Sequence, residues 1–374
     1  MKSLHYISGS TLPSQAANSV HVMKMCRAFV HCGMQTTLFA RGDATKTGEI
    51  FQYYGLEPEF DLALSPKHRI HLSRWALRLF AYRRLTAQRH LPDLVYGRDP
   101  AALYWLGHRL QRPFVYEAHH LPTSAFQRRI VTALIRSPRL QGIVVISDAL
   151  REDMLQLYPA LKDTRIITAH DGADVPVVTP QPVDLTEPGK EFSLEVGYVG
   201  SLYQGRGIDL ILALAARFPQ IRFHFLGGTP QEIAAWKERG VPDNVRFHGH
   251  RPHHEVQAWL AAFDVLLAPY PLKVRIGTGY DTGRWMSPLK IFEYMAAGKA
   301  IIGSDLPVLR EVLSHGETAQ LAMPESVEDW EAAIKVLLGN SDFREELGKR
   351  ALSEVRENFT WMARAQKIMD QHLE

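Results

Sequence analysis

A glycine-rich loop is the first part of the sequence that could do chemistry. It reads GSLYQGRG over residues 200–207, follows an apolar run and leads into an apolar helical stretch. Glycines leave backbone N–H groups accessible and a helix start carries partial positive charge, so the loop is suited to an anion such as phosphate. Arg206 would add a permanent, forked cation at the same place. The alternative interpretation is a tight turn with a surface arginine.

The loop also excludes two common nucleotide sites. It lacks the GK[ST] ending of a Walker loop, so ATP hydrolysis is not supported. It lacks the GxGxxG pattern as well, so a nicotinamide site is not supported.

A second helix start is indicated by the sequence WMSPLKIFE. Ser287 is suited to the N-cap and Pro288 to the first helical turn. Lys290 and Glu293 are three residues apart and therefore share a helix face. A cation in the first turn of a helix is unfavourable unless an anion lies beside it. A diphosphate between the two helix starts would suit Lys290 and Arg206 together; the alternative for Lys290 is a solvated surface lysine.

A histidine pair, His119 and His120, follows the apolar run 114–118. We expect His119 at the ligand-binding edge of a sheet, although a lone histidine beside a buried strand is often structural. No DxD-like carboxylate pair stands at a strand end, so the sequence does not require a metal ion. No facing carboxylate pair indicates a glycosidase either.

Alternating strands and helices must position these groups. The candidate strands are 35–40, 93–97, 114–118, 142–147, 165–169, 195–201, 222–227, 244–248, 263–268 and 300–305, and helical patterns include 206–217 and 288–297. Many of these strands are continuous runs of Val, Ile and Leu, which indicates parallel, doubly wound sheets covered on both faces.

A proline-rich stretch, residues 175–193, interrupts this alternation and is predicted to be a linker. We therefore expect an N-terminal domain over 1–180 and a C-terminal domain over 181–355. Open α/β sheets bind ligands at the carboxyl ends of their strands, which predicts a ligand cleft where two such edges face each other.

Composition excludes several classes of protein. The chain has 374 residues, of which 46% are hydrophobic and 22% charged, so it is an ordinary globular chain rather than a disordered one. Two cysteines, Cys26 and Cys32, exclude a disulfide scaffold. No apolar run is long enough for a signal peptide or a membrane span, so we expect a cytoplasmic protein. A net charge of +3 does not by itself indicate nucleic acid binding.

These motifs together resemble the retaining glycosyltransferases of family 4, which have the GT-B fold. The donor half is similar in the glycine loop and in VRFHGH, FDVLLAPY and SPLKIFEYMAAGKAIIGSDLP. The N-terminal half is similar in PSQAANSVHVMKMCRAF, DLVYGRDP, VYEAHH and VVISDALREDM. The closing residues, 356–374, resemble the family's last helix, which returns to the N-terminal domain.

The resemblance implies roles for individual residues. Arg206 falls on the basic residue that holds the donor diphosphate, Glu293 on the glutamate that binds the ribose, and His119 on the histidine that contacts the donor sugar. Residues 250–252 fall where the base is commonly met, and Asn18 lies beside a loop that faces the phosphates. The predicted catalytic residues are His119, Arg206 and Lys290, and the predicted donor-binding residues are Asn18, Gly200, Ser201, Arg251, Ser287, Pro288, Leu289 and Glu293.

The sequence departs from the family pattern at three places. Trp285 stands where the first glutamate of the E-x7-E motif is expected, and Ser201 replaces an arginine. Ala16 and Ala17 replace a glycine pair. We expect Lys290 to supply part of the missing charge.

A basic segment, residues 67–90, contains seven Lys or Arg residues and no acid. Trp75, Leu79 and Tyr82 follow helical spacing, and Arg74 and Arg78 flank them. Such a helix can lie in an anionic lipid interface, and arginines at 128, 129, 136 and 139 add to the charge. The alternative is an ordinary helix that packs on the sheet; nucleic acid is less favoured because no recognition motif accompanies the charge.

The sequence thus predicts a metal-independent glycosyltransferase without a cofactor, peripheral on the inner face of a membrane. It would move a sugar from a UDP- or GDP-sugar to a lipid-linked or cell-envelope glycan acceptor. The alternatives are a nucleotide-sugar epimerase of the same fold and a catalytically silent nucleotide- or glycan-binding partner.

Overall fold

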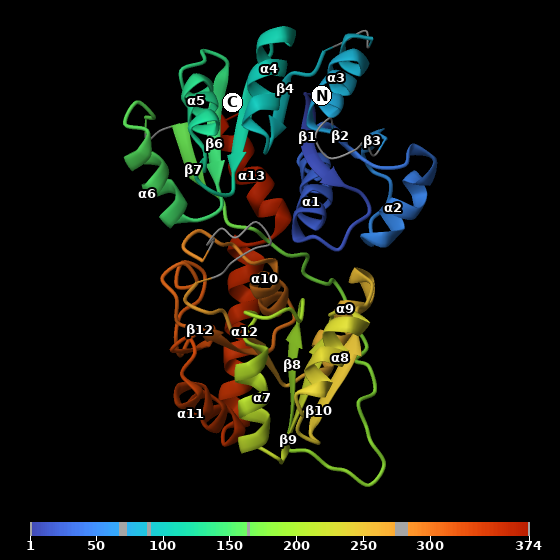
Figure 1. The fold of residues 1–374 in the computed structure, drawn as a ribbon, viewed down its shortest axis with the longest axis vertical. Helices are drawn as coiled ribbons and strands as arrows, with labels where there is room; N and C mark the ends of the chain where they lie inside the picture. The colour runs from blue at the N-terminus through green and yellow to red at the C-terminus, as the bar shows by residue number, and fades with distance from the viewer. Residues whose placement is uncertain (1, 67–72, 88–90, 163–164, 274–282, 373–374) are drawn as a thin grey trace. The chain divides into compact units, whose positions relative to one another are not determined.

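The computed structural model describes residues 2–66, 73–87, 91–162, 165–273 and 283–372. The chain divides into two compact units. Unit 1 is formed by Met1–Asp171 together with Trp361–Glu374, and unit 2 is formed by Gly172–Thr360. Each unit contains one parallel β-sheet with helices (Figure 1).

Unit 1 contains a seven-stranded sheet in the order β3-β2-β1-β4-β5-β6-β7, and its strand pairs are parallel. The strands are β1 (Ser3–Thr11), β2 (Gln35–Arg41), β3 (Asp61–Ser65), β4 (Leu94–Gly97), β5 (Phe114–Ala118), β6 (Leu140–Val145) and β7 (Ile166–Thr168). The order reverses beside β1, which lies between β2 and β4. Such a reversal is where open α/β sheets commonly bind ligands.

Helices cover both faces of this sheet. The N-terminal α1 and the C-terminal α13 pack against each other, and they lie side by side as the blue and red helices of unit 1 in Figure 1. In a second group of helices, α4 contacts both α3 and α5, and α3 and α4 pack on β1 to β5. The helices are α1 (Ala17–His31), α2 (Thr47–Tyr53), α3 (Ser73–Thr86), α4 (Pro100–Leu110), α5 (Ala125–Ile135), α6 (Asp148–Leu157) and α13 (Trp361–His372), with a short 3-10 turn at Ala44–Lys46.

Unit 2 contains a six-stranded parallel sheet in the order β10-β9-β8-β11-β12-β13. Its strands are β8 (Leu194–Val199), β9 (Ile221–Leu226), β10 (Val245–Gly249), β11 (Val265–Ala268), β12 (Ala300–Ser304) and β13 (Gln320–Ala322). Its helices are α7 (Ile208–Arg217), α8 (Pro230–Glu238), α9 (His253–Ala262), α10 (Leu289–Ala296), α11 (Val327–Leu338) and α12 (Ser341–Asn358). Two apolar clusters line the two faces of this sheet.

The parallel, doubly wound architecture predicted for both halves is confirmed. Every candidate strand overlaps a strand of the structure, and three further strands, β1, β3 and β13, escaped prediction. The last helix, α13, belongs to unit 1.

The described part of the basic segment packs on the sheet of unit 1 along a face different from the predicted one. Leu77, Ala81 and Leu85 are buried at four-residue spacing, whereas Leu79 is 45% exposed. Residues 67–72 and 88–90, and the side chain of Trp75, lie outside the described residues. Membrane docking therefore stays a prediction. Within the described ranges, no helix is long and apolar enough to cross a bilayer.

Candidate nucleotide-sugar site and the histidine cluster

The glycine loop of unit 2 brings two predicted residues close together. Gly200 directly follows β8 with φ of 152°, and a Cβ at this position would stand 3.0 Å from the Lys290 Nζ. Glycine is therefore the residue type that allows the lysine ammonium to approach the loop backbone. Gly207 caps the start of α7 in a left-handed conformation, and no side chain in the described part of the chain caps that helix. The first N–H groups of α7 are thus left for another acceptor.

Arg206 places a cation at this helix start, and no carboxylate among the described residues forms an ion pair with it. Its guanidinium lies 4.5 Å from the centre of the Tyr203 ring and donates to the Tyr203 hydroxyl. The buried Nε of Arg206 has no hydrogen-bond partner within the described residues. A buried N–H donor without an acceptor costs free energy, and a bound anion would supply the missing acceptor.

Lys290 is the second cation of the loop. Its side chain is half-buried, and its Nζ lies 4.1 Å from the centre of the Tyr198 ring and 5.3 Å from that of Tyr270. Burial, together with the nearby charge of Arg206, lowers the pKa of Lys290 to about 7. In the described ranges the ammonium has no carboxylate within ion-pair distance. A bound anion would therefore favour its protonated form.

The start of α10 differs from the prediction in one detail. Ser287 was predicted as the N-cap with Pro288 in the first turn, and this is wrong: Pro288 is the N-cap and the helix begins at Leu289. Pro288 has ψ of 121°, which is extended backbone, so the helix cannot include it. Proline offers no side-chain acceptor, and the N-terminal N–H groups of α10 consequently lack a side-chain cap from the described residues.

Glu293 lies one turn further along α10 and pairs with a residue that the sequence analysis missed. His253 Nε2, at the start of α9, is 3.0 Å from Glu293 Oε1. Both side chains are half-buried. The spacing of 40 residues between them gave no local signal; only the fold brings the start of α9 to the first turns of α10.

The remaining predicted donor residues lie at separate places. Ser201 is exposed after β8, where its carbonyl accepts a 3.0 Å hydrogen bond from the Tyr198 hydroxyl. Arg251 is exposed before α9, with its guanidinium 5.5 Å from the centre of the Trp259 ring. Asn18 belongs to unit 1, in the first turn of α1.

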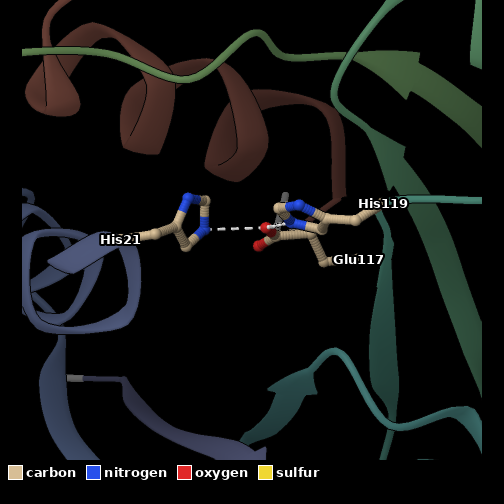
Figure 2. A group of neighbouring side chains, drawn as sticks. All are labelled: His21, Glu117 and His119. Carbon is tan, nitrogen blue, oxygen red and sulfur yellow. Dashed lines mark hydrogen bonds and ion pairs between the residues drawn. The ribbon is translucent and has the colours of Figure 1, made fainter. Parts of the chain in front are cut away.

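A buried carboxylate organises the histidines of unit 1. Glu117, on β5, is fully buried, and its Oε1 lies 2.5 Å from His119 Nε2 and 2.7 Å from His21 Nε2 (Figure 2). The Arg364 guanidinium of α13 is 3.4 Å from the same oxygen, and the Tyr96 hydroxyl donates to Oε2. These donors hold the pKa of Glu117 well below its ordinary value although burial acts in the opposite direction.

The ionised Glu117 fixes the state of His119. Burial, with a contribution from the charge of Arg98, lowers the pKa of His119 to about 3, so the ring is neutral near pH 7. An ionised carboxylate can only accept, so His119 Nε2 must carry the ring proton. His119 Nδ1 is then the acceptor nitrogen, available to a hydroxyl group. His119 itself lines a cavity of about 540 Å³ in unit 1.

The three groups are also close enough to be considered as metal ligands. Their ligand atoms lie at the distances of N–H···O hydrogen bonds, and the guanidinium of Arg364 adds a positive charge against the same oxygen. The arrangement is therefore better suited to hydrogen bonds between the rings and the carboxylate than to a bound metal ion.

Comparison with known proteins decides the family. The family description "Glycosyltransferase Family 4" matches residues 19–177, and "Glycosyl transferases group 1" matches residues 193–340. The chain belongs to glycosyltransferase family 4. The fold and the enzyme class predicted from the sequence are confirmed.

Individual relatives of this glycosyltransferase are distant. It is 25% identical over 315 residues to an alpha-maltose-1-phosphate synthase of Mycolicibacterium smegmatis, covering 75% of this chain and 74% of that one. It is 22% identical over 400 residues to a D-inositol 3-phosphate glycosyltransferase of Corynebacterium aurimucosum, covering 94% and 89%. The crystal structure of HepE from Anabaena in complex with UDP has a TM-score of 0.72 at 17% identity, with 99% of both chains covered. This likeness shows the GT-B fold.

Several side chains of the glycosyltransferase's two sites were not predicted. No role was assigned to His253 or to Glu117 from the sequence, although Glu117 lies within VYEAHH. Arg364 comes from the last helix and reaches Glu117 across more than two hundred residues of sequence. The signal that could have identified Glu117 was its type, because an acid inside a continuous apolar strand must have buried partners.

Proposed function

We propose that this glycosyltransferase uses a UDP- or GDP-sugar as donor and that the glycine loop of unit 2 binds the donor diphosphate. The observation that supports this most is the pair of cations, Arg206 and Lys290, that have no acidic partner in the described structure. The starts of α7 and α10, which have no side-chain cap from the residues that the structure describes, add N–H donors to the same loop. HepE, a structural neighbour, was crystallised with UDP.

The donor residues would divide the work. Arg206 and Lys290 neutralise the diphosphate as it departs, which is the electrostatic contribution expected to dominate such a transfer. Glu293, oriented by His253, binds the ribose hydroxyls. His119 accepts a hydrogen bond from a sugar hydroxyl through Nδ1. Because the protein supplies the positive charge itself, the proposed mechanism requires no metal ion.

The proposed transfer retains the anomeric configuration. The acceptor hydroxyl attacks the anomeric carbon from the face that the diphosphate leaves. The bond between that carbon and the diphosphate oxygen breaks, and a diphosphate oxygen takes the hydroxyl proton. We propose a lipid-linked or cell-envelope glycan as the acceptor.

Donor binding tests the proposal directly. Isothermal titration with UDP-, GDP-, ADP- and TDP-sugars should identify one base that binds more tightly than the others. Arg206→Gln should weaken that donor about tenfold or more, because a charge-assisted hydrogen bond is lost. Arg356→Gln removes the same charge from an exposed position on α12 and should leave the affinity unchanged. Equal affinities of both variants for the donor would contradict the assignment.

A further inference from the structure

A cavity of about 540 Å³ lies within unit 1, at the carboxyl ends of its central strands. Ser8 and Ser10 of β1 line it, together with Arg98 after β4 and His119 after β5. The reversal of strand order beside β1 places this cavity where doubly wound sheets bind ligands. Its lining is built from unit 1 alone.

The cavity carries more positive than negative charge. Three arginines, Arg41, Arg78 and Arg98, line it against two carboxylates, Asp99 and Glu117. Asp99 Oδ2 is 3.0 Å from the Arg78 guanidinium, and Asp99 also accepts from two N–H groups at the start of α4. Glu117 is engaged by the histidines and by the guanidinium of α13. Both carboxylates are thus already compensated.

Arg98 supplies the surplus charge. Its side chain is half-buried, and its guanidinium makes no hydrogen bond or ion pair with any residue in the described ranges. Gly97 pairs with Tyr116 in the sheet, so Arg98 and Glu117 follow at the same level of neighbouring strands. The charge of Arg98 is one cause of the lowered pKa of His119.

The remaining wall is suited to a partly hydroxylated ligand. The Ser8 hydroxyl donates a 2.8 Å hydrogen bond to the Ser10 hydroxyl, which leaves the second group a proton to donate. Phe126 of α5 also lines the cavity and is 72% exposed. An aromatic face beside polar groups is suited to a sugar ring, whereas a guanidinium without a carboxylate is suited to an oxyanion.

We propose that this cavity binds the acceptor, and that the acceptor is a sugar or polyol carrying an oxyanion, a phosphate or a carboxylate, that pairs with Arg98. The inference rests on the proposed function, because it assigns the cavity to the second substrate of the transfer. A neutral acceptor would leave the half-buried guanidinium of Arg98 without compensation.

Three hexoses that differ at one carbon test the charge requirement. Glucose 6-phosphate, glucuronate and glucose are titrated into the full-length protein saturated with UDP, which keeps anions out of the donor loop. At least one of the two anionic sugars should bind about tenfold or more tightly than glucose. If only glucose 6-phosphate binds more tightly than glucose, the acceptor carries a phosphate. If only glucuronate does, the acceptor carries a carboxylate. Equal binding of all three sugars would overturn the proposal.

Variants then assign the preference to one residue. Arg98→Gln should abolish the preference for the anionic sugar, and Arg98→Lys should restore part of it. Arg109→Gln removes a charge from an exposed position on α4 and should keep the wild-type preference. A preference that survives Arg98→Gln would overturn the proposal; if that variant does not fold, the comparison of sugars with wild-type protein still decides.

A failure of the proposed function can be distinguished from a failure of this inference. A wild-type protein that does not bind UDP or any nucleotide sugar contradicts the donor assignment in unit 2. In that case the three sugars are titrated without UDP, and the Arg98 variants still report whether unit 1 selects an anion.

Discussion

Raising the pH through neutrality should weaken the binding of a nucleotide sugar through Lys290. The pKa of this lysine is lowered to about 7 by burial and by the charge of Arg206. A bound diphosphate stabilises the ammonium form and so raises that pKa. Below the free-protein pKa the lysine is already protonated and affinity is constant; above it, binding must take up a proton, so affinity falls as the pH rises.

The size of the effect follows from that pKa. If Lys290 is fully protonated in the complex, affinity should fall about tenfold between about pH 6 and about pH 8, or ~1.4 kcal/mol. Isothermal titration in buffers of different ionisation enthalpy should detect uptake of about half a proton at pH 7, where the free lysine is half protonated. A UDP-sugar is the appropriate probe, because its diphosphate does not titrate in this range.

Three variants separate Lys290 from other titrating groups. Lys290→Met should bind more weakly and lose the pH dependence. Lys237→Met, at an exposed position on α8, should keep the wild-type profile. Arg206→Gln should move the midpoint to higher pH, because it removes a charge that opposes protonation of Lys290. The reasoning would be refuted if the affinity changed by less than about twofold between about pH 6 and about pH 8. It would also be refuted if the pH dependence persisted in Lys290→Met.

Other perturbations test separate parts of the structure. Gly200→Ala should weaken donor binding more than Gly205→Ala, because both glycines have a positive φ but only the first would place a Cβ within 4 Å of another group; equal losses would argue against the close approach. Glu117→Gln should lower the free energy of unfolding by about 3–5 kcal/mol in chemical denaturation, since it leaves a buried guanidinium uncompensated. Because the pKa of Glu117 is depressed in the folded protein, its ionisation stabilises the wild-type protein above about pH 4.5, and this stabilisation is lost as the pH falls further. The difference in unfolding free energy between wild type and Glu117→Gln should therefore shrink in acid. A difference that does not change with pH would contradict this prediction. Anionic liposomes should sediment the protein at low salt, and Arg83→Gln with Arg84→Gln should reduce the sedimented fraction; no sedimentation would exclude docking through the basic segment.

The sequence predicted the parts of the fold that have regular patterns. Continuous apolar runs such as 263–268 identified the central strands, because strands buried on both faces exclude polar residues. β1 escaped because its buried face includes Ser8 and Ser10, whose hydroxyls satisfy each other. β13 is only three residues long and carries no pattern. Short strands and locally satisfied polar groups are recognisable only once their neighbours are in place.

The candidate site was predictable where the chain itself brings residues together. The loop before α7 and the start of α10 each carry their own motif, and parallel pairing in one sheet brings Arg206 towards Lys290. Partners from distant segments were not predictable: the fold brings His253, at the start of α9, to Glu293, one turn into α10. Ser287 failed as an N-cap because the extended ψ of Pro288 delays the helix by one residue.

A crystal structure of the protein with its nucleotide sugar tests the central claim most directly. We expect the diphosphate within hydrogen-bond distance of the Arg206 guanidinium and the Lys290 ammonium, beside the first N–H groups of α7 and α10. A diphosphate bound elsewhere, with both cations still without an anionic partner, would contradict the account.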